Sequence, residues 1–124
     1  MAKSEEFIRY KYALAFYKLL LENKKKGIEN KEKGKEDLLL AETIGDISSS
    51  SELRKATISY ILSGLSNSKA TTIDALLDAL GKTYLDFANY IDNFSDSEIL
   101  EYKKIKEKER AERMKKKLKK KGKK

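Results

Sequence analysis

Residues 54–71 combine cations, hydroxyl groups, a phenol and an amide in a stretch that has helical spacing, RKATISYILSGLSNSKAT. Such groups suit the binding of an anionic partner through ion pairs and hydrogen bonds. Ile58, Ile61, Leu62 and Leu65 have the i, i+3, i+4, i+7 spacing of one buried helix face. The opposite face then carries small or hydrogen-bonding side chains together with cations, namely Arg54, Lys55, Ala56, Ser59, Tyr60 and Ser63.

This outward face differs from that of an ordinary solvated helix, which usually carries Lys, Glu and Gln because they favour helix more than Ser does. Small side chains allow close approach to a partner, and the cations lie at the helix end where the dipole is already positive. The combination is typical of a helix that enters the major groove of DNA between phosphates. The alternative is a plain solvated face, because Ser and Ala are common on helix surfaces.

Other chemistry is poorly represented in the 124 residues. Cys and His are absent, which excludes disulfide frameworks, the usual zinc sites and Cys–His or Ser–His pairs. The chain has no glycine-rich phosphate loop and no carboxylate cluster on an apolar helix face. We therefore expect no enzyme, no metal site and no cofactor, and nothing indicates a small-molecule ligand.

The net charge of +8 is unevenly distributed along the chain. Residues 98–124 hold 14 Lys or Arg against 5 Asp or Glu, whereas residues 1–97 hold 14 against 15. We expect one folded domain over residues 1–97 and a basic tail over residues 98–124. Such a tail favours nucleic acid or acidic surfaces, unless it is simply solvated. No apolar run approaches the ~20 residues of a membrane span, so we expect a cytoplasmic protein without membrane contact.

Pro is absent, Gly is sparse and strand signals are weak, so the sequence predicts an all-α protein, a compact bundle of about five helices. A long first helix is expected over residues 5–23, with Ser4 as its N-cap and Gly27 as its end, followed by a charged linker over 24–36. A second helix is expected over residues 37–45, ending at Gly45, and a loop over residues 46–51.

Four pairs have the spacing of a capping box, in which a Ser or Thr and an acid three residues later cap each other's backbone. They are Ser49 with Glu52, Thr71 with Asp74, Thr83 with Asp86, and Ser95 with Glu98. The first predicts a helix over about residues 50–64, and the next two predict helices within 71–94. The fourth opens the tail, which we expect to be a frayed helix that passes into disorder.

The first helix carries two apolar stripes, although an edge helix needs only one for its core. One stripe is Phe7, Tyr10, Leu14, Tyr17 and Leu21, and the other is Ile8, Tyr12, Ala15 and Leu19. The second stripe is expected to pack either on another part of the same chain or on a second subunit.

The order of these elements resembles the Cro/lambda-repressor-like (XRE) helix-turn-helix family over about residues 38–94. Leu40, Ala41 and Gly45 match the family's second helix. The run LRKATIS (53–59) and Gly64 match its recognition helix, and TIDALLDALG (72–81) and KTYLDFANYI (82–91) match the two helices that follow.

The resemblance implies a lambda-repressor-like fold and sequence-specific binding of double-stranded DNA by a transcription regulator, usually a homodimer. It places the helix-turn-helix core at residues 37–65. Residues implied at base edges are Arg54, Lys55, Ala56, Ser59 and Tyr60, with an aromatic lid as the alternative role of Tyr60. Residues implied at phosphates are Ser63, Asn67, Ser68, Lys69 and Thr71.

Two departures from the family bear on the docking geometry. DISSSSE adds about seven residues between Gly45 and Leu53, where the family has a tight turn. Asp37 stands where the family often has a Gln that holds a phosphate, so that contact is not carried over. The competing functions are a helical protein-interaction module and a non-specific nucleic-acid binder, of DNA or RNA, that acts through the basic tail.

Overall fold

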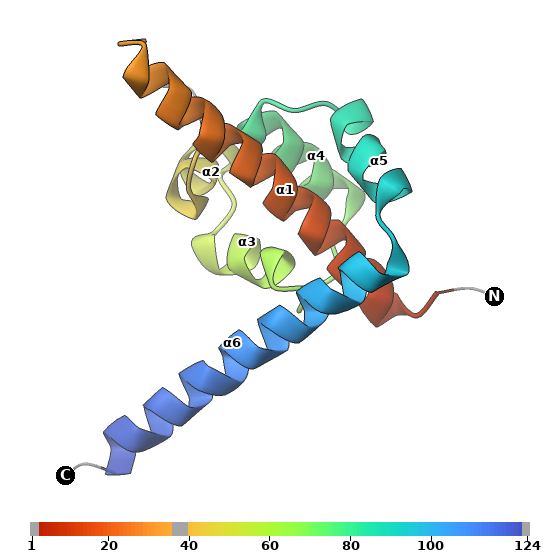
Figure 1. The fold of residues 1–124 in the computed structure, drawn as a ribbon, viewed down its shortest axis with the longest axis vertical. Coiled ribbons are helices and arrows are strands. Elements are labelled where there is room, and N and C mark those ends of the chain that lie inside the picture. Colours follow the sequence, from red (N-terminus) through yellow and green to blue (C-terminus); the bar gives the residue numbers. More distant parts are fainter. Residues whose placement is uncertain (1–2, 36–39, 123–124) are drawn as a thin grey trace.

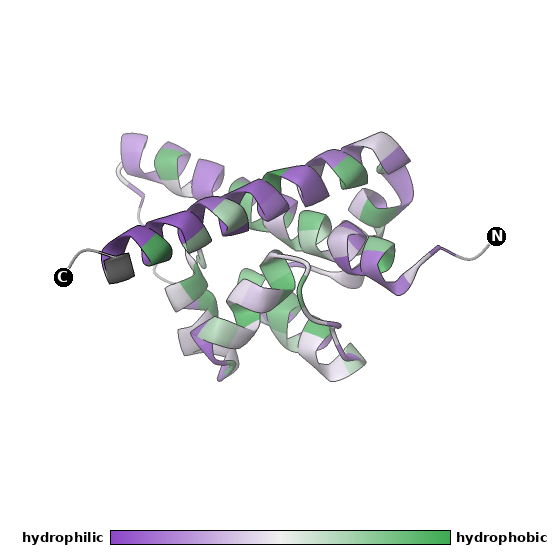
Figure 2. Ribbon diagram, turned by 90° about the horizontal axis from the view of Figure 1, so that it is seen from below, coloured by the Kyte–Doolittle hydropathy of each residue, from purple (hydrophilic) through white to green (hydrophobic). Residues whose placement is uncertain are grey.

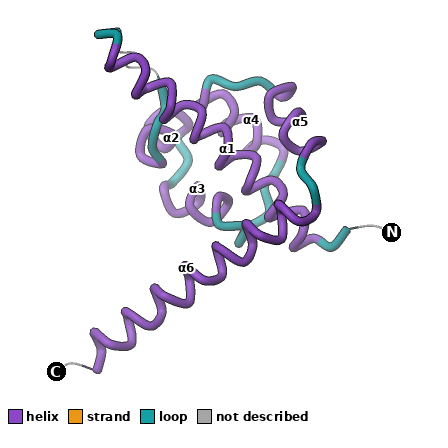
Figure 3. Tube along the Cα trace, in the orientation of Figure 1, coloured by secondary structure: helices purple, strands orange, loops and turns teal. Residues whose placement is uncertain are grey.

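The computed structural model describes residues 3–35 and 40–122, which form six α-helices and no strand (Figures 1 and 3). The prediction of an all-α protein is therefore confirmed for these residues. The helices are α1 (Glu5–Glu32), α2 (Ile44–Ser51), α3 (Lys55–Leu62), α4 (Ala70–Leu80), α5 (Tyr84–Asn93) and α6 (Asp96–Gly122).

Helix α1 runs across the bundle and contacts α3, α4, α5 and α6 (Figure 1). One of its sides enters the main core, which includes Phe16, Leu19, Ile58, Leu77 and Phe87. Another side packs Tyr10, Ala13 and Leu14 against Ile99 and Tyr102 of α6. The stripe of Tyr10 and Leu14 is thus covered by α6, while Ala15 and Leu19 of the other stripe lie in the main core, although Ile8 is 40% exposed. Most of both stripes therefore packs on the same chain.

The first helix is longer than the predicted range of residues 5–23, and residues 24–32 of the predicted linker belong to it. Its start is confirmed, because Ser4 Oγ accepts a hydrogen bond of 3.1 Å from the backbone nitrogen of Phe7. Gly27 does not end the helix but lies buried within it, where the Glu42 carboxylate occupies the space of a side chain. The predicted end was wrong because a helical Gly can serve close approach instead of termination.

The second predicted helix, over residues 37–45, is corrected by the structure. Residues 37–39 lie outside the described residues, residues 40–43 are not helical, and the helix begins at Ile44. Thr43 and Asp46 form the capping box that opens it, with hydrogen bonds of 3.1 and 3.2 Å. The predicted loop over 46–51 is helix α2 itself, held by the burial of Ile47 in the core.

Two of the four predicted capping boxes are confirmed, those of Thr83 with Asp86 and of Ser95 with Glu98. The other two were wrong. Ser49 lies inside α2, and α3 begins only at Lys55, after the N-cap Arg54. Helix α4 begins at Ala70, and its N-cap is Lys69 instead of the predicted Thr71.

Most of the predicted core is buried, including Ile58, Ile61, Leu76 and Leu80. Leu65 was predicted to be buried but is 47% exposed, and Leu85, an apolar residue of the helix predicted after Thr83, is 70% exposed. Leu65 follows Gly64, whose φ of +74° turns the chain out of the line of α3, so the helical spacing no longer applies there. Leu85 lies in the first turn of α5, on its solvent side.

A buried polar side chain, Asn23, joins three segments of the fold and was not singled out by its position in the sequence. It is 2% exposed, and its amide Nδ2 donates to the carbonyl oxygens of Ala41 at 2.9 Å and Leu80 at 3.0 Å. The amide therefore fixes the approach to α2 and the end of α4 against α1.

Of the two expected forms of the basic tail, helical or disordered, the described residues show the helical one, because α6 is one helix over Asp96–Gly122. Its first turns pack on α1, and its later turns are exposed and hydrophilic (Figure 2). Among residues 3–35 and 40–122, no helix has the length and apolar character needed to cross a membrane.

Candidate nucleic-acid interface

Helices α2 and α3 are joined by only three residues, 52–54. Glu52 takes the left-handed conformation with φ of +63°. Ser51 Oγ accepts from the backbone nitrogen of Leu53 at 3.2 Å, and Ser48 Oγ donates to the carbonyl oxygen of Leu53 at 2.6 Å. The expected insertion of seven residues is therefore absent, because those residues form α2. Three residues is the connection length of a helix-turn-helix unit.

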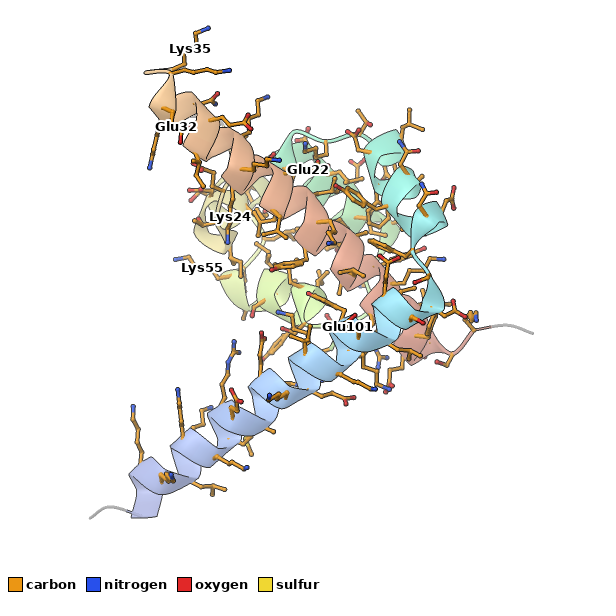
Figure 4. All side chains as sticks on the ribbon, in the orientation of Figure 1. Glu22, Lys24, Glu32, Lys35, Lys55 and Glu101 are labelled. Carbon is orange, nitrogen blue, oxygen red and sulfur yellow. The ribbon has the colours of Figure 1, made fainter. Side chains whose placement is uncertain are left out.

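The five residues that the resemblance implied at base edges all reach the surface at or near α3. Arg54, Lys55 and Ala56 are exposed, and Ser59 is half-buried. Lys55 extends away from the bundle at the start of α3 (Figure 4). Tyr60 is 55% exposed, so its ring does not serve as a lid packed on the bundle.

The helix starts fall into two groups. The first residues of α1, α2, α5 and α6 are capped by the side chains of Ser4, Thr43, Thr83 and Ser95. Helices α3 and α4 have Arg54 and Lys69 as N-caps, and neither helix has a side-chain cap hydrogen bond. The two starts without such a cap are thus the two in the implied DNA-contacting stretch, and both carry a cation.

The residues implied at phosphates are distributed unequally. Lys69 and Thr71 are exposed at the start of α4, and Ser68 is half-buried next to them. Ser63 is half-buried, and the Asn67 amide donates to the carboxylate of Glu5. The structure therefore brings Ser68, Lys69 and Thr71 to one helix start, while Asn67 already has an acidic partner within the chain.

The start of α2 is less suited to an anion. Asp37, which stands where the family often has a phosphate-holding Gln, lies outside the described residues. The carboxylate of Asp46 accepts from the backbone nitrogens of Glu42 and Thr43 at 3.0 and 3.2 Å. This negative group occupies the helix end, so phosphate contacts are better placed at α3 and α4.

The opposite end of α3 is capped by three side chains that the sequence did not reveal. Tyr102 donates to the carbonyl oxygen of Leu62, Arg110 Nη1 to that of Ser63 at 3.0 Å, and Arg9 Nε to that of Gly64 at 3.1 Å. Two guanidinium groups thus face the negative end of the helix dipole. Burial raises the pKa of Tyr102, so the phenol keeps its donor proton.

Comparison with protein-family models, with curated proteins and with solved structures gives no match for this chain. The assignment of a function therefore rests on the residues and geometry described above.

Proposed function

We propose that this chain is a DNA-binding transcription regulator of the lambda-repressor-like helix-turn-helix type, with α3 as the helix that reads duplex DNA. The observation that carries the proposal is the pair of helix starts at Arg54 and Lys69, in a unit whose helices α2 and α3 are three residues apart. A cation at a helix start is repelled by the positive end of the helix dipole, and the first four N–H groups of a helix lack intrahelical partners. A backbone phosphate would neutralise the cation and accept hydrogen bonds from these N–H groups.

The roles of the side chains follow from their chemistry. Arg54 and Lys55 would donate to O6 and N7 of guanine, and Ala56 would contact a thymine methyl group. Ser59 and Tyr60 offer donors and acceptors further along the same exposed face. Lys69 and Thr71, at the start of α4, would hold a phosphate and thereby fix the position of α3 in the groove.

A homodimer on a two-fold operator is part of this proposal, although the two stripes of α1 no longer support it, since α6 covers Tyr10 and Leu14 and the main core holds Ala15 and Leu19. The remaining support is the symmetry that helix-turn-helix dimers share with their operators. A palindrome with half-sites about 10 base pairs apart, or a multiple of that distance, would agree with a dimer.

The experiment is selection of duplexes from a random pool by the full chain at near-physiological salt. We expect an enriched motif, and loss of about 1–3 kcal/mol of binding to it, roughly 5- to 150-fold, in Arg54→Ala and in Lys55→Ala. Lys35→Ala is the matched control, because it removes one exposed cation beyond the end of α1 (Figure 4). An equal loss in all three variants, or no enriched motif, would contradict the proposal.

The second candidate is non-specific nucleic-acid binding through α6, favoured by the exposed cations of its last turns. This function predicts equal affinity for any duplex or RNA of one length and no response to Arg54→Ala. A protein-interaction module predicts no affinity for DNA at near-physiological salt, so the same selection separates all three functions.

A further inference from the structure

The last turns of α6 form a separate basic surface. We define the α6 arm as residues 111–120, all of which are exposed. It contains the cations Arg113, Lys115, Lys116, Lys117, Lys119 and Lys120, and residues 113–120 contain no acid. The ion pairs between described residues that involve α6 lie before this arm, as in Lys103 with Glu6 and Lys106 with Glu109.

The cations of α6 divide into two faces. The side of α6 that contacts the bundle carries Ile99, Tyr102, Lys106 and Arg110. Helical spacing continues that side with Arg113, Lys117 and Lys120, with Lys116 at one edge, and we call these four residues the inner face. Lys104 and Lys108, which precede the arm, and Lys115 and Lys119 within it lie on the outer face, about opposite. The apolar Met114 borders the other edge of the inner face, and Leu118 lies beyond it.

The arm has a fixed position relative to α3. Arg110 donates to the carbonyl oxygen of Ser63 and also to the phenol oxygen of Tyr10 at 2.6 Å. The Tyr102 hydroxyl donates to the carbonyl oxygen of Leu62. Beyond this attachment, the helix projects clear of the bundle (Figure 1). From Arg110 to Lys120 it extends about 15 Å, at about 1.5 Å per residue.

The arm is electrostatically unfavourable by itself. Arg113 and Lys117, and likewise Lys116 and Lys120, are like charges at i, i+4, which destabilise an isolated helix. Closely spaced anions on the partner would remove that repulsion. A duplex offers one phosphate charge per about 1.7 Å of its axis. An acidic protein surface fits less well, because cations rather than apolar side chains form the centre of the inner face, where a protein interface is most apolar.

We propose that the inner face of the α6 arm is a second DNA-contacting surface, which binds backbone phosphates of the duplex that flanks the site read by α3. This inference rests on the proposed function, because binding by α3 would set the position of the duplex. The contacts of α6 with Ser63 and Leu62 set the position of the arm relative to α3. Arg113, Lys116, Lys117 and Lys120 supply affinity without reading sequence, since phosphate contacts carry no direct sequence information.

The test compares two full-length quadruple variants that remove the same charge from the same helix. The inner variant is Arg113→Gln with Lys116→Gln, Lys117→Gln and Lys120→Gln. The outer variant is Lys104→Gln with Lys108→Gln, Lys115→Gln and Lys119→Gln. Affinity is measured against salt concentration on the selected duplex and on a scrambled duplex of equal length. Circular dichroism checks that both variants keep the helix content of the wild type.

We expect the inner variant to reduce the magnitude of the slope of log K against log salt by about 2–4, since each lost phosphate contact removes about 0.9 from that slope. The outer variant should change the slope by less than about 1. Trimming about five base pairs of flanking duplex, which corresponds to the 15 Å reach, should weaken the wild type and leave the inner variant unchanged.

The two proposals fail in different ways. Equal flattening by the inner and outer variants would overturn the proposal for the arm, while a retained preference for the selected duplex would leave reading by α3 standing. A slope that depends on the face, without preference for the selected duplex, would overturn reading by α3 and support phosphate contacts by the arm.

Discussion

Arg110 of α6 donates a hydrogen bond of 3.0 Å to the carbonyl oxygen of Ser63, the residue that ends α3, although 47 residues separate them in the chain. The same guanidinium donates to the phenol oxygen of Tyr10 in α1 at 2.6 Å. One side chain thus joins the basic helix, the first helix and the end of the candidate recognition helix. The C-terminal helix is therefore part of the bundle up to this residue.

Arg110→Ala should destabilise the fold by about 1–2 kcal/mol, because it removes two hydrogen bonds from a charged, partly buried group. Urea unfolding measures this effect. Arg113→Ala, one turn further and exposed, should change stability by less than about 0.5 kcal/mol. Equal effects of the two substitutions would show that α6 is not held by the contact to Ser63.

Gly64→Ala should be far more damaging than Gly81→Ala. Both glycines have positive φ, +74° and +69°, so both variants carry a backbone strain of about 1–2 kcal/mol. A methyl group at Gly64 would lie 2.4 Å from the ring of buried Tyr10, whereas nothing lies within 4 Å of one at Gly81. Overpacking adds about 1–3 kcal/mol at Gly64 only. Thermal unfolding of both variants tests the difference, and similar melting temperatures would contradict it.

Glu52→Gly should stabilise the protein by about 0.5–1 kcal/mol. The left-handed conformation at φ of +63° strains any residue with a Cβ by about 1–2 kcal/mol, and the entropy cost of Gly offsets part of the relief. Glu52→Ala keeps the strain and should show no such gain in urea unfolding. If both variants gained equally, repulsion of the Glu52 carboxylate would be the cause. Under the proposed function, either variant also removes a negative charge beside Arg54 and should tighten DNA binding.

The contact between Glu6 and Lys103 should make the docking of α6 dependent on pH. The hydrogen bond from Lys103 lowers the pKa of Glu6, and the same bond raises the pKa of Lys103. The stabilisation by Glu6 is present above its unfolded pKa of about 4.3 and is lost as pH falls through the lower folded value. The stabilisation by Lys103 is present below about pH 10.4 and is lost as pH rises through the higher folded value.

Glu6→Gln should therefore lower the urea midpoint at pH 7, and its difference from the wild type should shrink as pH falls through the lowered pKa of Glu6. Glu101→Gln, an exposed carboxylate of α6, is the control and should leave the midpoint at pH 7 unchanged. A difference between Glu6→Gln and wild type that persisted unchanged at pH 3 would mean that packing, rather than the ion pair, is responsible.

Features that depend on neighbouring residues were predictable. The all-α class follows from the absence of Pro and the apolar spacing, and the caps at Ser4, Thr83 and Ser95 follow from short motifs. The turn at Gly81 was predictable for the same reason, since left-handed glycine is the usual end of a helix.

Helix α2 was placed wrongly because the capping box of Ser49 with Glu52 was assigned to the start of the next helix, while that of Thr43 with Asp46 was not considered. Thr43 with Asp46 and Ser49 with Glu52 have the same capping spacing, and local rules do not rank them. Burial of Ile47 against the core selects the first, and the loop predicted there becomes the helix. The apparent insertion between the motif helices followed from this one error. The candidate site residues came from the polar face of α3 and from the family resemblance, and the error did not affect them.

The sequence by itself determined the helical class, the apolar stripes, the basic C-terminal segment and the polar face of α3, because each depends on residues a few positions apart. Only the tertiary structure decided that α6 covers the stripe of α1 that contains Tyr10 and Leu14. It also decided that Arg9, Tyr102 and Arg110 cap α3. Those contacts join residues 40 or more positions apart, and their free energy exists only after the helices have packed.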